Sequence, residues 1–261
     1  MRHIGYSVKF QTEPAYKSIR YGQGTIYSSA CGPASLCNAL KTMGLADVSI
    51  PTMCSLATSC GARVSGGTIL ATLLKAAAPK YGFQYTSTSK NAALLAHLQA
   101  GGAAILHAGS AHPLFSTGGH FVTAAAASGQ TITVLDSYWY SGKYTATALR
   151  RGNVRVVQKG VIQTSLTQCG KATIDRSPSY YLLSRIRKQP EPMQTEKQQD
   201  KQEDDMKYYK TVQDIPEYYR DAVKKLTACG AIAGEGDGLN LSEDLCRAFT
   251  ILDRIGLLPD A

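Results

Sequence analysis

The stretch that most constrains this chain covers residues 27–40, where small polar residues lead into Cys31. Pro33 follows closely and suits the first turn of a helix, where a missing N–H costs nothing. Apolar residues then recur at helical spacing, which predicts a buried helix over about 32–43. The partial positive charge at a helix N-terminus favours a thiolate, the reactive form of cysteine. Cys31 is therefore a candidate nucleophile; the alternative is a small buried thiol at a helix start.

A candidate base and its orienting carboxylate follow in a predicted hairpin. His120 begins a strand after two glycines, and Asp136 follows the strand that returns from a turn at 128–130. A turn centred on Ser128 places Asp136 directly opposite His120, within reach of the imidazole ring. A nucleophile needs a base, and the base needs an orienting group. Cys31, His120 and Asp136 together therefore predict a catalytic triad.

The other histidines and cysteines carry weaker signals. His107 lies inside an apolar run, which is typical of a core histidine whose nitrogens are hydrogen-bonded. The seven cysteines are odd in number and show no C-x-x-C pair and no zinc-like spacing. We therefore expect mostly reduced thiols, no metal site and no other cofactor.

The charge of the chain is unevenly distributed. Residues 1–186 contain 17 Lys and Arg against 4 Asp and Glu, whereas residues 208–261 contain 6 and 9, and the net charge of the whole chain is +9. A strongly basic first part indicates an anionic partner or surface. The sequence shows no nucleic-acid-binding motif and no basic helix, and an anionic bacterial wall accounts for the charge equally well. We therefore predict no nucleic-acid partner.

The order of patterns predicts the organisation of the chain. Helical patterns come first and strand patterns follow, so residues 1–187 are expected to form an α+β domain with an antiparallel sheet. Residues 188–207 consist largely of Gln, Glu, Asp and Lys, which predicts a charged flexible linker. Residues 208–261 regain apolar residues at helical spacing and predict a small helical module, marginal on its own.

Individual elements can also be predicted within these parts. In the first part we expect helices over about 32–43 and 51–59, one after Thr68 and one capped by Asn91. Strands are expected at 103–107, 120–123, 131–135, 144–149, 153–158, 160–165 and 180–186. In the tail, one helix should follow Pro216, and a second should begin after Ser242 and carry Leu245, Phe249, Leu252 and Ile255.

The candidate site residues lie in motifs that resemble a known family. Residues 24–36, GTIYSSACGPASL, resemble the nucleophile motif of papain-like cysteine peptidases of the bacteriocin-leader-processing type. Residues 119–122 and 134–137 resemble the family's histidine and aspartate motifs, and residues 66–68 resemble its mid-domain loop. The resemblance covers about residues 5–187. It implies a papain-like fold, a Cys-His-Asp mechanism and an oxyanion hole that uses a glutamine side chain.

The glutamine departs from the common pattern of that family. Many papain-like enzymes place it about six residues before the cysteine, where this chain has Thr25. Gln11 matches the longer spacing of relatives that carry the Gly-Thr-Ile motif. Gln23 is closer, but it lies in a loop position that those relatives fill with other residues. We prefer Gln11 for the oxyanion hole, with Gln23 as the alternative.

The tail resembles a second kind of protein. Residues 209–216 and 238–244 resemble a small C-terminal module that follows catalytic domains in phage and bacterial cell-wall lytic enzymes. This resemblance implies that residues 208–261 bind the cell wall or mediate self-association. The two resemblances together predict a cysteine peptidase that cuts peptide bonds in bacterial peptidoglycan, as phage endolysins do. The alternatives are a cytosolic cysteine protease or transferase acting on a soluble peptide, and a catalytically inactive binding module.

The expected location follows from what the sequence lacks. No apolar run approaches the length of a membrane span, and the first residues lack the apolar core of a signal peptide. We therefore expect no membrane insertion. The resemblance to endolysins implies a cytoplasmic chain in the host cell that acts at the wall after release.

Overall fold

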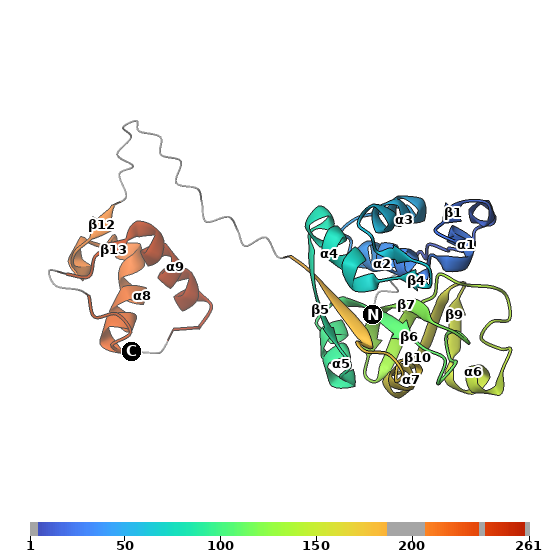
Figure 1. Ribbon diagram of the computed structural model, residues 1–261. Coiled ribbons are helices and arrows are strands. Elements are labelled where there is room, and N and C mark those ends of the chain that lie inside the picture. Colours follow the sequence, from blue (N-terminus) through green and yellow to red (C-terminus); the bar gives the residue numbers. More distant parts are fainter. Residues whose placement is uncertain (1–4, 187–206, 235–237, 259–261) are drawn as a thin grey trace. The chain divides into compact units, whose positions relative to one another are not determined.

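The computed structural model divides the chain into two compact units, Met1–Pro190 and Glu191–Ala261 (Figure 1). The residues that it describes are 5–186, 207–234 and 238–258. The predicted linker over 188–207 lies outside the described residues, except for its last residue. Each unit is described by itself below.

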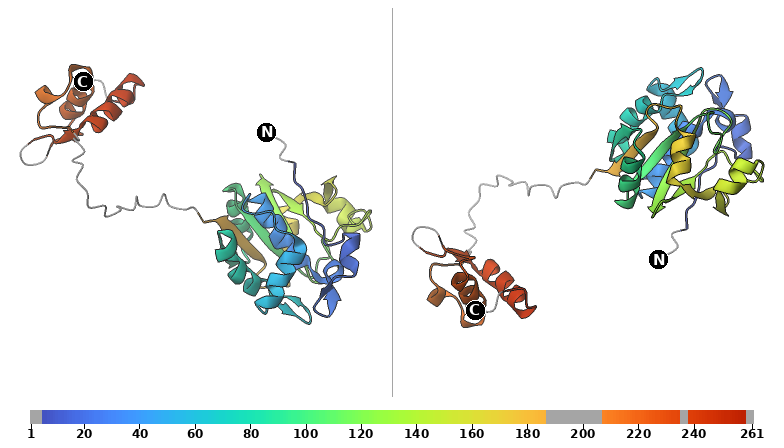
Figure 2. Two further views of the ribbon diagram at one scale, coloured as in Figure 1. Left: turned by 90° about the horizontal axis from the view of Figure 1, so that it is seen from above. Right: turned by 90° about the horizontal axis from the view of Figure 1, so that it is seen from below.

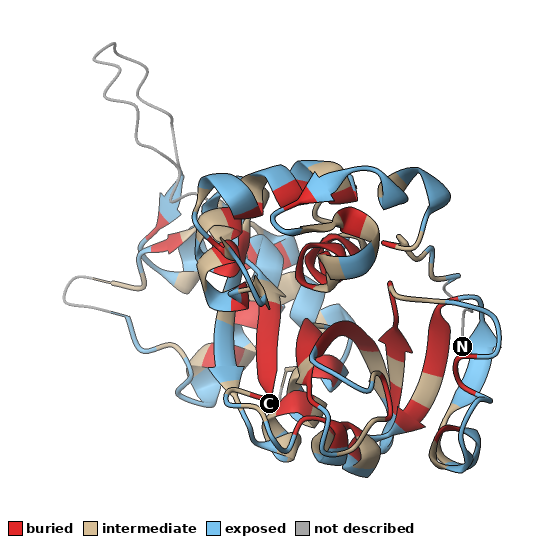
Figure 3. Ribbon diagram, turned by 45° about the vertical axis from the view of Figure 1, so that its right-hand side comes forward, coloured by how far each residue is buried: buried red, intermediate tan, exposed pale blue. Residues whose placement is uncertain are grey.

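A seven-stranded antiparallel sheet forms the centre of the first unit (Figure 1). Its spatial order is β5, β11, β6, β7, β8, β10 and β9, and every neighbouring pair is antiparallel. The strands are β5 (Phe83–Thr88), β6 (Ala103–Ala108), β7 (His120–Ser128), β8 (Thr131–Leu135), β9 (Arg155–Gln158), β10 (Val161–Ser165) and β11 (Tyr180–Arg185). The central strands are largely buried, as the red ribbons in Figure 3 show.

Helices cover both faces of this sheet. On one face, α2 (Cys31–Thr42), α3 (Ile50–Ser59) and α4 (Leu70–Tyr81) share a core with Ile105 and Leu183. On the other face, α5 (Asn91–Gln99) and α7 (Leu166–Ala172) share a core with Leu106 and Leu182. Successive strand residues point to opposite faces, so β6, β7 and β11 each contribute to both cores. Figure 2 shows the N-terminal helices, blue to cyan, gathered together in this unit. The predicted α+β class is confirmed.

Short elements complete the first unit. They are η1 (Pro14–Lys17), β1 (Arg20–Tyr21), β2 (Gly24–Thr25), α1 (Ile26–Ser29), β3 (Arg63–Val64), β4 (Gly67–Thr68) and α6 (Ala148–Asn153). The two-stranded pairs β1–β2 and β3–β4 are antiparallel hairpins. They lie outside the large sheet, and both belong to the helical half of the unit's sequence.

Some predicted elements are wrong. The strand expected at 144–149 is absent, and α6 begins there instead because the Thr147 side chain accepts a hydrogen bond from the Arg150 N–H at 3.3 Å. Asn91 does not cap α5 but is its first residue, and its side-chain oxygen accepts a hydrogen bond from the Tyr180 hydroxyl at 2.7 Å. Strand β5 and helix α7 were not predicted, because neither has a distinctive apolar period.

The β7–β8 hairpin differs from the prediction in register. Thr123 pairs with Leu135, and a bulge separates Ala124 from Ala126. The turn occupies residues 129 and 130 rather than centring on Ser128, so continuing this register places residue 138, not Asp136, opposite His120. A shift of two residues keeps a side chain on the same face of a sheet, which explains why Asp136 still reaches His120.

The second unit contains two helices, α8 (Glu217–Ala228) and α9 (Glu243–Arg254). It also contains η2 (Val212–Asp214) and a short antiparallel pair, β12 (Tyr208–Tyr209) and β13 (Leu241–Ser242). Ser242 caps α9 by accepting a hydrogen bond from the Leu245 N–H at 3.3 Å. The core of the unit gathers Tyr209, Ile215, Tyr219, Val223, Leu241 and Cys246.

Much of the apolar pattern on α9 does not enter that core. Leu245 is 42 % exposed, Leu252 is 37 % exposed and Ile255, just after the helix, is 61 % exposed. Two short helices offer too little surface to cover a second apolar face. Within the described residues of both units, no helix is long and apolar enough to span a membrane.

Candidate active site

Cys31 is the first residue of α2 and lies directly after the short helix α1. A capping box between Thr25 and Ser28 fixes the start of α1. No side chain caps α2 at Ala30, so the first N–H groups of α2 lie beside the thiol. This is the local arrangement that the sequence predicts, and it favours a negative charge on the sulfur.

Two buried hydrogen bonds hold α2 against β7, one helical turn after the cysteine. The Ser35 hydroxyl donates to the Phe121 carbonyl at 2.9 Å, and the Thr123 hydroxyl donates to the Ser35 carbonyl at 2.8 Å. Because His120 directly precedes Phe121, these bonds fix the start of β7 relative to Cys31. His120 lowers the pKa of the Cys31 thiol through its side-chain hydrogen bond and its charge.

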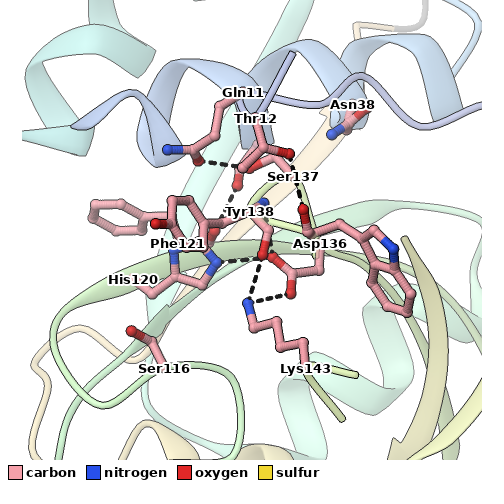
Figure 4. A network of polar contacts seen from close by, with 12 residues as sticks. Gln11, Thr12, Asn38, Ser116, His120, Phe121, Asp136, Ser137, Tyr138 and Lys143 are labelled. Carbon is pink, nitrogen blue, oxygen red and sulfur yellow. Dashed lines mark hydrogen bonds and ion pairs between the residues drawn. The ribbon is translucent and has the colours of Figure 1, made fainter. Parts of the chain in front are cut away.

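His120 and Asp136 form a buried pair, with His120 Nε2 2.9 Å from Asp136 Oδ1 (Figure 4). His120 is 5 % exposed and Asp136 is fully buried. Because Nε2 faces the carboxylate, Nδ1 is the ring nitrogen left to face the thiol. The same Asp136 oxygen accepts a hydrogen bond from the Tyr138 N–H at 3.0 Å. The structure therefore brings together the three residues predicted as a triad.

The pKa values of the three groups shift in the directions that an ion pair requires. Burial raises the pKa of the Cys31 thiol, but the hydrogen bond and charge of His120 and backbone hydrogen bonds at Phe121 and Gly32 bring that pKa below its usual value. Burial lowers the pKa of His120, yet its hydrogen bonds to Asp136 and Cys31 leave that pKa raised. A thiolate and an imidazolium are therefore favoured together.

Two residues that sequence reasoning missed bind the other oxygen of Asp136. The Lys143 ammonium donates to Oδ2 at 2.5 Å and to the Tyr138 carbonyl at 2.8 Å (Figure 4). The Tyr144 hydroxyl also donates to Oδ2, at 2.7 Å. Although burial raises the pKa of Asp136, the charges of Lys143 and His120 and their hydrogen bonds hold it well below its usual range. No sequence pattern marks Lys143, and Tyr144 begins the stretch 144–149 that was predicted as a strand.

Gln11 lies beside this network, whereas Gln23 does not join it. The Gln11 side chain is buried, and its Nε2 donates to the Tyr27 carbonyl at 3.0 Å. Its Oε1 accepts from the Ser137 hydroxyl at 3.0 Å (Figure 4). The Gln11 N–H also bonds to the Ser137 carbonyl at 3.0 Å. Gln23 is exposed in the turn between β1 and β2. The structure thus favours Gln11 over Gln23 as a neighbour of the site.

The Gln11 segment is anchored to α2 as well. The Asn38 side chain accepts a hydrogen bond from the Lys9 N–H at 2.8 Å and donates one to the Lys9 carbonyl at 3.1 Å. The segment around Gln11 therefore bridges the helix that carries Cys31 and the loop that follows Asp136. Within the described residues, no group of three or more His, Cys, Asp or Glu side chains is placed to hold a metal ion.

No protein-family model matches this sequence, and no curated protein matches it. One solved structure with a similar chain path is the crystal structure of a candidate C39-like peptidase from Bacillus anthracis. The two chains share 14% sequence identity at a TM-score of 0.41, and the match covers 60% of this chain and 90% of the other.

Proposed function

We propose that this chain is a papain-like cysteine peptidase that hydrolyses peptide bonds in bacterial peptidoglycan, as an endolysin does. The observation that carries the proposal is the meeting of Cys31, His120 and Asp136 from three separate elements, with the thiol at a helix N-terminus and the histidine bonded to a buried carboxylate.

In the proposed mechanism, the Cys31 thiolate attacks the carbonyl carbon of the scissile bond. The tetrahedral intermediate collapses to a thioester while His120 gives its proton to the leaving amine. His120 then takes a proton from water, and the resulting hydroxide attacks the thioester. Collapse releases the new carboxyl group and restores the Cys31–His120 pair. Asp136 orients the ring and stabilises its charged form in both halves of the reaction.

The negative oxygen of the intermediate needs donors aimed at it. Gln11 is our candidate because its amide carries two N–H groups and its neighbours hold the side chain in place. One N–H bonds to Tyr27, and the second would donate to the oxyanion together with the Cys31 backbone N–H. Gln11→Ala should therefore lower the rate of chemistry by about a hundredfold. The variant should leave thiol alkylation at Cys31 within a few-fold of wild type.

Two features favour a cell-wall substrate over a soluble peptide. Residues 1–186 are strongly basic, which suits an anionic wall. The second unit exposes apolar side chains on α9, including Ile251 at 54 % and Ile255 at 61 %. Exposed apolar surface of this kind marks interaction sites, and we propose that it binds the wall or a second copy of the unit. Ile251→Ser with Ile255→Ser should weaken sedimentation with purified walls.

The deciding experiment compares purified wild-type protein and Cys31→Ala on purified Gram-positive cell walls. Turbidity should fall only with wild type, and mass spectrometry of the fragments should show new amino termini from a cleaved peptide bond. Clearing by both proteins would refute the mechanism. If neither protein cleared walls while Cys31 still reacted with iodoacetamide, the substrate would be a soluble peptide instead.

A further inference from the structure

The helical and strand cores leave very few buried polar atoms without a partner. Within the described residues, these atoms are Arg63 Nε and Nη1, His107 Nδ1 and Arg176 Nε. An unpaired buried polar group costs free energy, so each one calls for an explanation. Arg63 has one, because its guanidinium stacks 4.3 Å from the centre of the Tyr21 ring. His107 and Arg176 have no comparable explanation.

His107 and Arg176 both lie against the start of β7, His107 on the Phe121 ring and Arg176 beside Gly119. Burial, and after it the positive charge of Arg176, lower the pKa of His107 to about 4. At neutral pH the pair therefore consists of an uncharged ring and a full positive charge. The prediction that His107 is a core histidine with satisfied nitrogens is wrong, because its Nδ1 has no hydrogen-bond partner among the described residues.

This pair borders the candidate active site through the two residues that flank His120. The His107 ring stacks on Phe121, with ring centres 4.5 Å apart, and the two residues pair across β6 and β7. Arg176 Nη2 lies 3.3 Å from the position that a Cβ atom on Gly119 would occupy. The Phe121 ring also lies beside the residue that follows Cys31, because a Cβ atom on Gly32 would be 3.5 Å from it. His107 and Arg176 therefore each contact a residue that is next to His120 in the sequence.

The carboxylate of Asp175, which directly precedes Arg176, is already bound by backbone N–H groups. Asp175 Oδ2 accepts hydrogen bonds from the N–H groups of Ser110 at 3.0 Å and Ala111 at 3.3 Å. Gly109 permits this approach, because a Cβ atom there would overlap the Asp175 carboxylate. Asp175 forms no ion pair with Arg176 among the described residues, although its charge partly offsets that of the guanidinium.

We propose that Arg176 and His107 form a subsite for a carboxylate of the substrate, carried by one of the two residues on the acyl side of the scissile bond. The proposal rests on the peptidase function proposed above and narrows its substrate class. A substrate carboxylate would accept hydrogen bonds from the guanidinium, whose planar fork matches a carboxylate. Neutral His107 would add one N–H donor from its Nδ1 tautomer. Gly119 lacks a side chain, which leaves room beside the guanidinium.

Active-site-directed probes can test the subsite without knowledge of the natural substrate. Peptidyl chloromethyl ketones alkylate a reactive thiol with loss of chloride, and four of them suffice: acetyl-Xaa-Gly and acetyl-Gly-Xaa derivatives with Xaa as Glu or Gln. The rate of Cys31 modification is measured by intact mass for the full-length wild type, Arg176→Gln, Arg176→Glu and Arg155→Gln. Arg155 is an exposed arginine on β9 and controls for general charge.

The proposal expects the Glu probe to react at least about tenfold faster than the Gln probe at one of the two positions in wild type. Arg176→Gln should bring this ratio near one, Arg176→Glu should bring it below one, and Arg155→Gln should retain it. A ratio near one at both positions in wild type, or an equal fall in Arg155→Gln, would overturn the subsite alone. Failure of every probe to label Cys31 in folded protein would instead overturn the proposed peptidase, and the subsite with it.

Discussion

Two histidines at the same end of the sheet are held in opposite states. His107 on β6 pairs with Phe121 on β7, and His120 is the residue directly before Phe121. Burial disfavours the charged form of both rings. The pKa of His107 accordingly falls to about 4, whereas that of His120 is raised despite its burial.

The difference lies in the neighbours of each ring rather than in its depth. His120 contacts the Asp136 carboxylate and the Cys31 thiol, which stabilise a proton on the ring. His107 has the Arg176 guanidinium beside it, which repels a proton. One strand pair thus carries a histidine suited to moving protons and a histidine suited to remaining neutral. The charge of the neighbouring side chain decides whether the ring holds a proton.

The largest expected effect comes from replacing each histidine in turn. His120→Gln should lower the rate of peptide-bond cleavage by about a thousandfold or more, because it removes the proton carrier. His107→Gln should lower that rate by less than about tenfold, because the ring lies outside the reacting groups. The measurement is the initial rate of new amino termini released from cell walls. Equal losses in the two variants would erase the distinction between the histidines.

The two carboxylates beside these histidines should differ in the same way. Asp136→Asn is expected to reduce cleavage by about a hundredfold or more, because an amide favours the wrong tautomer of His120 and carries no charge. Asp175→Asn changes a carboxylate that bonds to the Ser110 and Ala111 backbone, so a much smaller reduction is expected. Rates and thermal unfolding should be measured together. Comparable rate losses at equal stability would contradict the role assigned to Asp136.

The sequence predicts the surroundings of Cys31 better than the contacts of Asp136. Cys31 could be placed because its surroundings are local: a proline, a helical period and a helix N-terminus follow one another along the chain. The contacts of Asp136 could not be predicted, because Lys143 and Tyr144 reach it from a loop that carries no periodic signal. The hairpin register was wrong by two residues, yet the pairing of His120 with Asp136 survived because strand faces repeat every two residues.

Local patterns along the chain also explain which other features could be predicted from the sequence and which could not. Helices α3 and α9 were predicted because they combine a serine cap with an apolar period, and α2 and α8 because they combine a proline near their start with such a period. The unpartnered nitrogens of His107 and Arg176 could not be predicted, since they depend on which side chains the folded sheet leaves without a partner. The sequence placed His107 in a core from its apolar neighbours alone. Only the tertiary arrangement reveals the arginine beside it.

Lys143 and Tyr144 allow charge to be separated from hydrogen bonding at Asp136. Both donate to the same oxygen, but only Lys143 carries a charge. The ammonium opposes a proton on His120, so Lys143→Met should raise the pKa of His120 and move the alkaline limb of the activity profile up by about one pH unit. Tyr144→Phe removes one neutral donor and should move that limb much less. Equal shifts would show that hydrogen bonding, not charge, sets the profile.

The smallest effect concerns how stability depends on pH, where the two histidines should act in opposite directions. His107 binds a proton near pH 4 when folded but near about 6.5 when unfolded, so acidification between these values favours unfolding. His107→Phe keeps the stack on Phe121 and should flatten the fall of Tm over this range, by about 2–4 °C. The raised pKa of His120 instead adds stability at acid pH, which is lost as pH rises through that pKa.

His120→Gln should therefore change the dependence of Tm on pH in the direction opposite to His107→Phe, with Tm lowered more at pH 5 than at pH 8. Thermal unfolding of the three proteins between pH 4 and pH 8 tests both signs in one series. If both variants tilted the curve alike, burial alone would govern the two rings, because burial is the influence that they share. Opposite tilts would instead require the charges that separate them, a carboxylate beside one ring and a guanidinium beside the other.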